Sequence, residues 1–125
     1  MNKTKFYKCD ICGNFVGVLH SSGVPMFCCG QPMTQVEAKD QDSGYEKHIP
    51  EVTQEGDVMK VQVGSVLHPM EEKHHIAWIY VETKNGGQRK ACVGTPTAEF
   101  TFVNDEPLAV YEYCNLHGLW VKKLN

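Results

Sequence analysis

The sequence of 125 residues lacks the long apolar run that a membrane-spanning helix requires, and its first ten residues lack the apolar core of a signal peptide. It also has no low-complexity tract and no excess of basic residues, since the formal net charge is -3. A weakly acidic chain gives no support for a nucleic-acid surface. These absences predict a cytoplasmic protein that has neither a membrane nor a nucleic acid as its partner.

No stretch of ten or more residues shows a convincing helical period, so we expect little helix. Polar and apolar residues alternate instead from Val58 to Val66 and, less cleanly, from His75 to Glu82. Asn85-Gly86-Gly87 is a strong signal for a hairpin turn. Further strands are predicted at residues 98–103, 109–113 and 119–122. Several short strands joined by turns favour a β-sandwich.

The six cysteines need an explanation other than disulfides, because the cytosol keeps thiols reduced. Four lie near the N-terminus and two lie apart, at Cys9, Cys12, Cys28, Cys29, Cys92 and Cys114. The last of them forms a Cys-x-x-His pair with His117. This distribution predicts one complete four-thiolate metal site, a second mixed site and one spare thiol. We expect the spare thiol, Cys92, to be a buried or half-buried free cysteine inside a strand.

Residues 1–36 are predicted to form a compact unit around the four-cysteine cluster, and the polar residues 38–44 predict a linker after it. Gly13, directly after Cys12, supports the tight turn that brings two sulfurs onto one metal. So short a unit has too little core to fold alone, so a bound metal would supply much of its stability. Four thiolates suit zinc and iron alike, and a purely structural zinc knuckle is the simplest alternative. The adjacent pair Cys28-Cys29 departs from a zinc ribbon and should distort a tetrahedral site.

The rest of the chain carries a second set of nitrogen and sulfur donors: His48, His68, His74, Cys114 and His117. A closed structural zinc site needs four ligands, so five donors favour a redox metal that keeps a sixth position open for a small substrate. His74 and His75 are adjacent and face opposite ways in an extended segment, so only one of them should join the site. We assign His75 and His20 to the surface.

Two charged residues, Glu46 and Lys47, precede the first of these histidines. A flexible lysine ammonium near an open metal position would attract a small anion and could organise a proton-carrying water. The glutamate could reach the same position as a transient carboxylate ligand. The alternative is a solvated ion pair with no part in chemistry.

Four blocks of the chain, taken in order, resemble desulfoferrodoxin, the two-iron class of superoxide reductase. They cover nearly the whole sequence: Cys9-x-x-Cys12 with Cys28-Cys29, Glu46-Lys47-His48-x-Pro50, His68-Pro69-Met70-Glu71-Glu72-Lys73-His74-x-Ile76-x-Trp78, and Cys114-Asn115-x-His117-Gly118. The resemblance implies a rubredoxin- or desulforedoxin-like metal knuckle at residues 1–36. It implies a neelaredoxin-like catalytic domain, with an immunoglobulin-like β-sandwich, at residues 37–125.

The same resemblance implies two iron ions in each chain. A rubredoxin-type iron would be held by Cys9, Cys12, Cys28 and Cys29. A catalytic iron would have four histidines in a plane and one axial cysteine, namely His48, His68, His74, His117 and Cys114. Glu46 would take the sixth position in the oxidised resting state, and Lys47 would guide the substrate. Members of the family are typically homodimers.

The implied activity is the one-electron reduction of superoxide to hydrogen peroxide, which serves superoxide detoxification. An electron donor such as rubredoxin would then re-reduce the catalytic iron. One alternative is an electron carrier or redox sensor that uses only the four-cysteine iron. Another is a zinc-stabilised binding module.

Overall fold

The computed structural model describes residues 4–42 and 47–124. All regular structure among these residues is β, in twelve strands, and none of them belongs to a helix that could cross a membrane. The chain forms two compact units, Met1–Glu37 and Ala38–Asn125. The prediction of a mainly β chain with little helix is confirmed.

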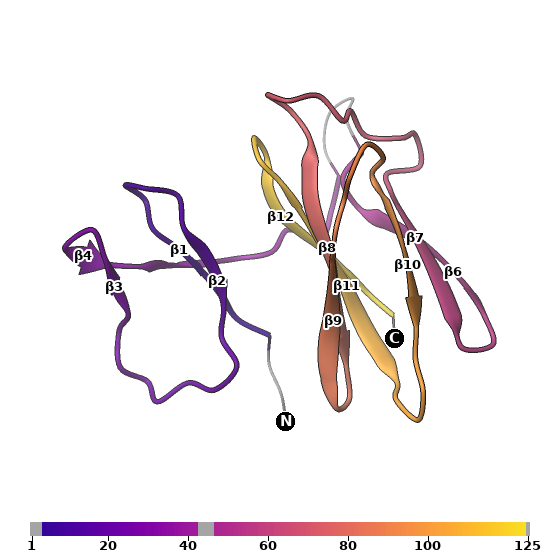
Figure 1. Ribbon diagram of the computed structural model, residues 1–125, viewed down its shortest axis with the longest axis horizontal. Helices are drawn as coiled ribbons and strands as arrows, with labels where there is room; N and C mark the ends of the chain where they lie inside the picture. Colours follow the sequence, from indigo (N-terminus) through magenta and orange to yellow (C-terminus); the bar gives the residue numbers. More distant parts are fainter. Residues whose placement is uncertain (1–3, 43–46, 125) are drawn as a thin grey trace. The chain divides into compact units, whose positions relative to one another are not determined.

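The first unit is a knuckle of five short strands (Figure 1). They are β1 (Phe6–Lys8), β2 (Phe15–Gly17), β3 (Phe27–Cys28), β4 (Gln31–Pro32) and β5 (Thr34–Val36). β1 is the centre of a three-stranded sheet between β2 and β5, whereas β3 and β4 form a hairpin. Within the described residues of this unit only Phe6 and Cys9 are buried apolar residues, and Phe6 packs against Phe15 with ring centroids 5.8 Å apart. A core of this size supplies little stabilisation, so the unit needs a further cross-link.

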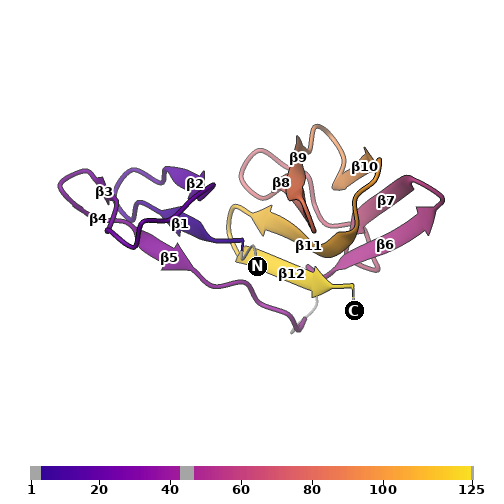
Figure 2. The ribbon, with the colours of Figure 1, turned by 90° about the horizontal axis from the view of Figure 1, so that it is seen from below.

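The second unit is a β-sandwich of two antiparallel sheets (Figure 2). One sheet has the strand order β10-β7-β6, with β6 (Pro50–Glu55), β7 (Val58–Val63) and β10 (Thr97–Thr101). The other has the order β12-β11-β8-β9, with β8 (Ile76–Thr83), β9 (Gly86–Ala91), β11 (Pro107–Cys114) and β12 (Gly118–Lys123). Three and four short strands in two facing sheets confirm the predicted sandwich.

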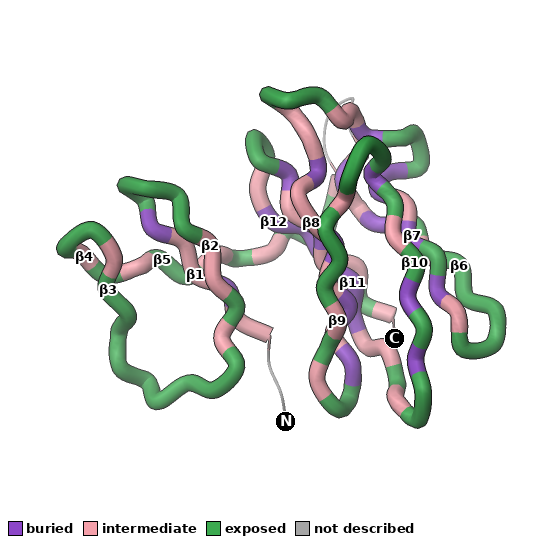
Figure 3. Tube along the Cα trace, in the orientation of Figure 1, coloured by how far each residue is buried: buried purple, intermediate pink, exposed green. Residues whose placement is uncertain are grey.

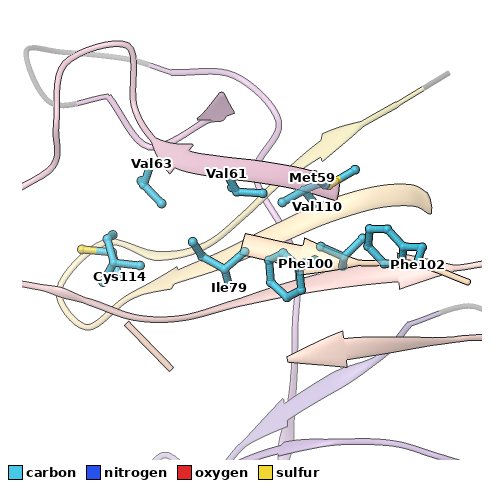
Figure 4. Packing of buried hydrophobic residues seen from close by; sticks show 10 residues of the cluster. Met59, Val61, Val63, Ile79, Phe100, Phe102, Val110 and Cys114 are labelled. Carbon is cyan, nitrogen blue, oxygen red and sulfur yellow. The ribbon is translucent and has the colours of Figure 1, made fainter. Parts of the chain in front are cut away.

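Apolar side chains from both sheets fill the space between them. Along β7, Met59, Val61 and Val63 are buried whereas Lys60 is exposed, which is the period of two that a half-buried strand requires (Figure 3). Residues of β8, β10 and β11 complete this core, including Ile79, Val81, Phe100 and Val110. Figure 4 shows these side chains in a row that has Phe102 at one end and Cys114 at the other. The core therefore ends at a thiol.

The second unit differs from the sequence-based expectation in two of its strands, in the position of Cys92 and in the predicted linker. β6 and β9 were not predicted, because β6 begins at a proline and its other residues are mostly exposed, and because β9 is polar along its length. Cys92 lies after the end of β9, not inside a strand, although it is half-buried as expected. The predicted linker is packed in part against the sandwich, since Lys39 bridges to Trp120 and Asp42 accepts hydrogen bonds from the next segment.

Two candidate metal centres

The four N-terminal cysteines converge on one point. The sulfurs of Cys9, Cys12, Cys28 and Cys29 all lie within 4.8 Å of one another, and those of Cys12 and Cys28 are 3.6 Å apart. A tetrahedral ion with metal–sulfur bonds of about 2.3 Å separates its sulfurs by about 3.8 Å. The spacing and the donor type therefore fit a single four-thiolate ion.

Backbone conformation explains how two adjacent cysteines reach the same point. Cys29 has a φ of 53°, in the left-handed region, and Gly30 follows with 77°. A left-handed residue reverses the chain direction, so both side chains can turn to one side. The adjacent pair that the sequence analysis set apart from a zinc ribbon is thus accommodated by the backbone.

The crowded thiols do not ionise equally. A backbone N–H donated by Cys12 lowers the pKa of Cys9 to about 6, and the Cys12 N to Cys9 Sγ distance is 3.4 Å. Contact with the sulfurs of Cys12 and Cys9 raises the pKa of Cys29 to about 12. Only a cation can keep all four sulfurs in the thiolate form at neutral pH. This chemistry supports a metal site.

The second cluster joins the five donors predicted from the sequence: His48, His68, His74, Cys114 and His117, whose ligand atoms lie within 4.8 Å of one another. His48 lies just before β6, His68 and His74 lie in the connection between β7 and β8, Cys114 ends β11, and His117 lies in the turn before β12. Pro50 pairs with Val63, and Cys114 pairs with both Ile76 and Gly118. The antiparallel registers thus bring every ligand segment to one end of the sandwich.

The four imidazoles form a closed ring of neighbours in the order 48, 68, 74, 117. Their centroids are 4.8 Å apart for His48 and His68, and 4.7 Å for His68 and His74. The centroids of His74 and His117 are 5.1 Å apart, and those of His117 and His48 are 5.0 Å apart. The four sides are nearly equal, so we call this arrangement the imidazole square; His68 and His117 occupy opposite corners of it. The Nε2 atoms of His48 and His68 are 3.2 Å apart, near the spacing of about 3 Å expected for adjacent nitrogens on one ion.

The thiol of Cys114 lies close to two corners of this square. Its Sγ is 3.6 Å from His68 Nε2 and 3.7 Å from His117 Nδ1, the nitrogens at two opposite corners. The sulfur is thus nearly equidistant from two opposite corners, as a fifth ligand of an ion shared by all four imidazoles would be. Cys114 and the first two histidines are buried, whereas His74 is partly buried and His117 is exposed. The thiol therefore approaches from the core side.

Contacts behind the ligands fix their orientation. The Nδ1 of His68 lies 2.8 Å from the carbonyl oxygen of Pro69, so this nitrogen carries the proton and Nε2 presents its lone pair to the cluster. The ring of His48 stacks on Trp120, with centroids 4.5 Å apart and planes 8° from parallel. The backbone N–H of His48 donates to Asp42 Oδ1 at 2.6 Å. Imidazoles held in this way are oriented to bind a cation.

Asn115 joins the two segments that carry the later ligands. Its side-chain amide donates to the Lys73 carbonyl at 3.0 Å, and its side-chain oxygen accepts the His75 N–H at 2.8 Å. Its backbone N–H donates to the His75 carbonyl at 3.1 Å. These three bonds hold the residues on both sides of His74 against the turn that carries Cys114 and His117.

Of the two charged residues before His48, the structure describes only Lys47. Glu46 lies outside the described residues. Lys47 is partly buried, and its backbone packs on Gly64, where a Cβ atom would lie 2.6 Å from the Lys47 carbonyl oxygen. Gly64 has a φ of +82°, which favours glycine, so the close approach depends on this residue.

Two histidines lie outside both clusters, as predicted. His75 turns its Nδ1 to the carbonyl oxygens of Glu71 and Glu72, at 2.9 and 3.1 Å. His20 is exposed. Within the described residues, only His74 of the adjacent pair joins the cluster.

The sequence analysis missed one buried acid, Glu112, two residues before Cys114. It is fully buried, and its carboxyl oxygens have no hydrogen-bond partner in the described part of the chain. Burial, with a smaller contribution from Asp42, raises the pKa of Glu112 to about 9, so the side chain is neutral at pH 7. A signal was available, because a glutamate between Val110 and Cys114 occupies an inward position of the predicted strand.

Comparison with known proteins gives concordant matches over both units. Residues 40–123 match the family model described as desulfoferrodoxin, and residues 1–36 match that of the desulfoferrodoxin N-terminal domain. The chain is 47% identical over 116 residues to a desulfoferrodoxin homolog of Archaeoglobus fulgidus, which covers 91% of this chain and 92% of the relative. It is 44% identical over 121 residues to the desulfoferrodoxin of Nitratidesulfovibrio vulgaris, which covers 95% of each. The crystal structure of the superoxide reductase from Treponema pallidum superposes with a TM-score of 0.84 at 34% identity, covering 97% of this chain and 98% of that chain.

Proposed function

Because the chain belongs to the desulfoferrodoxin family, and its two donor clusters match the two iron centres of that family, we propose that it is a superoxide reductase. The reaction joins one superoxide anion, one electron and two protons to give hydrogen peroxide. His48, His68, His74, Cys114 and His117 hold the catalytic iron, and the four N-terminal cysteines hold the other. Residues 1–36 are the four-cysteine domain, and residues 37–125 are the catalytic domain.

The observation that carries this proposal is the square of four imidazoles together with a thiol that lies nearly equally far from two opposite corners. Five donors leave one position of an octahedral ion for a small ligand. When held by these five donors, ferrous iron would supply the single electron, and the Cys114 thiolate would push electron density onto the iron. Cys114 is fully buried and His117 is exposed, which supports approach of the substrate from the side away from the thiol.

Side chains of the protein attract the superoxide anion, orient the histidine ligands and deliver a proton. The ammonium of Lys47, adjacent to the ligand His48, attracts the superoxide anion and orders a water that delivers a proton. The bond from His68 Nδ1 to the Pro69 carbonyl keeps the ring nitrogen that faces the cluster free of its proton. By the same family resemblance, Glu46 would be a further ligand of the iron in the oxidised resting state.

Rubredoxin or a similar cytoplasmic carrier supplies the electron that restores the ferrous state. The exposure of Cys12 and Cys29 supports electron entry at the four-cysteine iron. The same exposure favours a second candidate function, an electron carrier or redox sensor that uses this iron alone.

We assign the active protein as a homodimer. The first unit exposes Leu19, Val24 and Phe27 at 103%, 73% and 66%, which is a large apolar exposure for a knuckle with so small a core. Light scattering after size-exclusion chromatography tests this assignment. A mass near 14.1 kDa, that of one chain, would contradict it.

The decisive experiment exposes the reduced, iron-loaded protein to superoxide generated by pulse radiolysis. We expect superoxide to disappear and hydrogen peroxide to form without release of oxygen. Stoichiometric oxygen would identify a dismutase and reject the proposal. A Cys114→Ser variant with undiminished activity would favour the electron carrier, and two zinc ions in place of iron in protein from the native host would favour a zinc-stabilised binding module.

A further inference from the structure

Lys39 is fixed beside the five-donor cluster by its own backbone. Its N–H donates to the Leu119 carbonyl at 2.9 Å, and its carbonyl accepts the Val121 N–H at 2.8 Å. Together these bonds make a parallel bridge to Trp120 at the edge of the four-stranded sheet. A residue in a polar segment predicted to be a linker is therefore held at one position of β12.

The side chain of Lys39 contacts two groups that lead directly to ligands. Its Nζ donates to the carbonyl oxygen of His117 at 2.9 Å, and it lies 4.9 Å from the centroid of the Trp120 ring. The same indole stacks on the ring of His48. One ammonium thus contacts the backbone of one ligand and the aromatic support of another.

The indole of Trp120 is buried, and its Nε1 has no hydrogen-bond partner in the described part of the chain. The position of the indole is therefore set by packing and ring contacts, among which the cation–π contact with Lys39 and the stack on His48 are the directional ones.

We propose that Lys39 is a positioning residue of the five-donor centre: through the His117 carbonyl and Trp120 it holds His117 and His48, at adjacent corners of the imidazole square, and adds a positive charge beside them. The inference rests on the proposed function only in that an iron ion occupies the cluster. A nearby cation stabilises the less positive, ferrous form relative to the ferric form. Lys39 therefore raises the reduction potential of the centre.

The test compares the iron-loaded wild-type protein with Lys39→Met, Lys39→Arg and Lys123→Met. Methionine keeps the length of the side chain but loses its charge and its N–H donors. Arginine can still donate to the His117 carbonyl and stack on the indole. Lys123→Met removes an equal charge from the exposed end of β12 and controls for net charge.

We expect Lys39→Met to release iron from the five-donor centre to a chelator about tenfold faster, at the lower end of the effect of losing an outer-shell partner. Its reduction potential should become more negative, and the visible thiolate-to-iron band of the oxidised centre should shift. Lys39→Arg should restore all three properties, and Lys123→Met should leave them unchanged. The four-cysteine iron of the same molecule is the internal reference.

A Lys39→Met protein with wild-type release rate, potential and band position would overturn the inference, as would an equal effect of Lys123→Met. The release rate, the reduction potential and the band position are all measured on the iron-loaded protein without superoxide. They therefore do not depend on the proposed activity. If the wild-type protein fails to reduce superoxide while Lys39→Met still alters the centre, the proposed function falls and the positioning role stands. If the chelator assay is repeated with zinc and the same order of variants is found, the role does not depend on iron.

Discussion

We propose Lys47 as the residue whose charge steers the substrate toward the five-donor centre. We predict that Lys47→Ile slows the second-order reaction with superoxide about tenfold or more and weakens its dependence on ionic strength, because a steering cation is lost. Both metal centres should remain loaded. Pulse radiolysis at several salt concentrations measures the effect, with Lys123→Met as the control for net charge. An unchanged rate constant would contradict the steering role.

Asn115 is predicted to act through His74. Asn115→Ala removes both side-chain bonds to the segment 73–75, and the affinity of the five-donor centre for its ion should fall about 10- to 100-fold. Competition with a chelator measures this loss. Asn85→Ala is a matched control, because it removes an asparagine from the turn at the other end of the sandwich. Equal metal affinity in the Asn115→Ala and wild-type proteins would show that the side-chain hydrogen bonds of Asn115 are not needed to hold the ion.

The sequence analysis found the metal-ligand residues but missed the residues that hold those ligands in place. Cysteines and histidines carry their chemistry in their own side chains, and their local motifs were sufficient to find them. Asn115 acts on residues forty positions away, and Lys39 acts on residues near the opposite end of the chain. Such contacts depend on strand register, which a single sequence does not specify. Glu112 was missed as well, although the alternation of its strand was sufficient to place it inward.

Among the structural elements, the connection after β7 depends on Gly64. We predict that Gly64→Ala lowers the free energy of unfolding by about 2 kcal/mol or more, because the new Cβ would meet the carbonyl oxygens of Lys47 and Val66 at 2.6 Å and the backbone would be strained. The displaced Lys47 adjoins His48, so ion release from the five-donor centre should also accelerate.

Gly56→Ala provides the control for this substitution. Gly56 also has a positive φ, of +59°, but a Cβ there would meet nothing within 4 Å. It should cost only about 1–2 kcal/mol of backbone strain and leave ion release unchanged. Urea denaturation and chelator kinetics on both variants distinguish the two effects. Equal behaviour of the two variants would mean that the contact with Lys47 is unimportant.

The turn at the far end of the sandwich gives a prediction about pH. The hydroxyl of Thr83 donates to Asp105 at 2.6 Å, and this bond, with backbone N–H groups of Glu106 and Asn85, holds the pKa of Asp105 below its ordinary value. The folded state thus favours the ionised form. The stability gained is present above the pKa of the unfolded chain and is lost as pH falls through the folded pKa.

Asp105→Asn should therefore be less stable than the wild type at neutral pH, and the difference should shrink in acid. Both proteins lose their ions alike at low pH, so the quantity to compare is the difference in their free energies of unfolding at each pH. A difference that stays constant down to strongly acidic pH would contradict the network.

Strands could be predicted from the sequence where one face of the strand is apolar, but not where both faces are polar. The alternation in β7 placed its strand within a few residues of the observed bounds. β9 pairs with only one neighbour and exposes most of its residues, so burial imposed no pattern on its sequence. Its existence follows from the hairpin turn that the sequence did reveal.

At the scale of the whole molecule, the two units are predicted to hold their ions independently. Cys12→Ser removes one of four thiolates and should abolish the four-cysteine iron, while the ion content of the five-donor centre and the rate of superoxide capture stay within about twofold of the wild type. Metal analysis and pulse radiolysis on the same sample measure both. Loss of both ions from the variant would show that the units depend on each other.

The position of the ligands along the chain has a consequence for the lifetime of the protein. His48 precedes β6 and His117 lies between β11 and β12, so nearly the entire sandwich forms a loop closed by the ion. A closed loop restricts the unfolded chain, and complete unfolding requires the ligands to dissociate first. The rate of ligand exchange at the metal then limits how fast a protease can reach the backbone. A cell short of iron would clear the unloaded chains first, so the stock of this protein would follow its metal supply without a separate sensor.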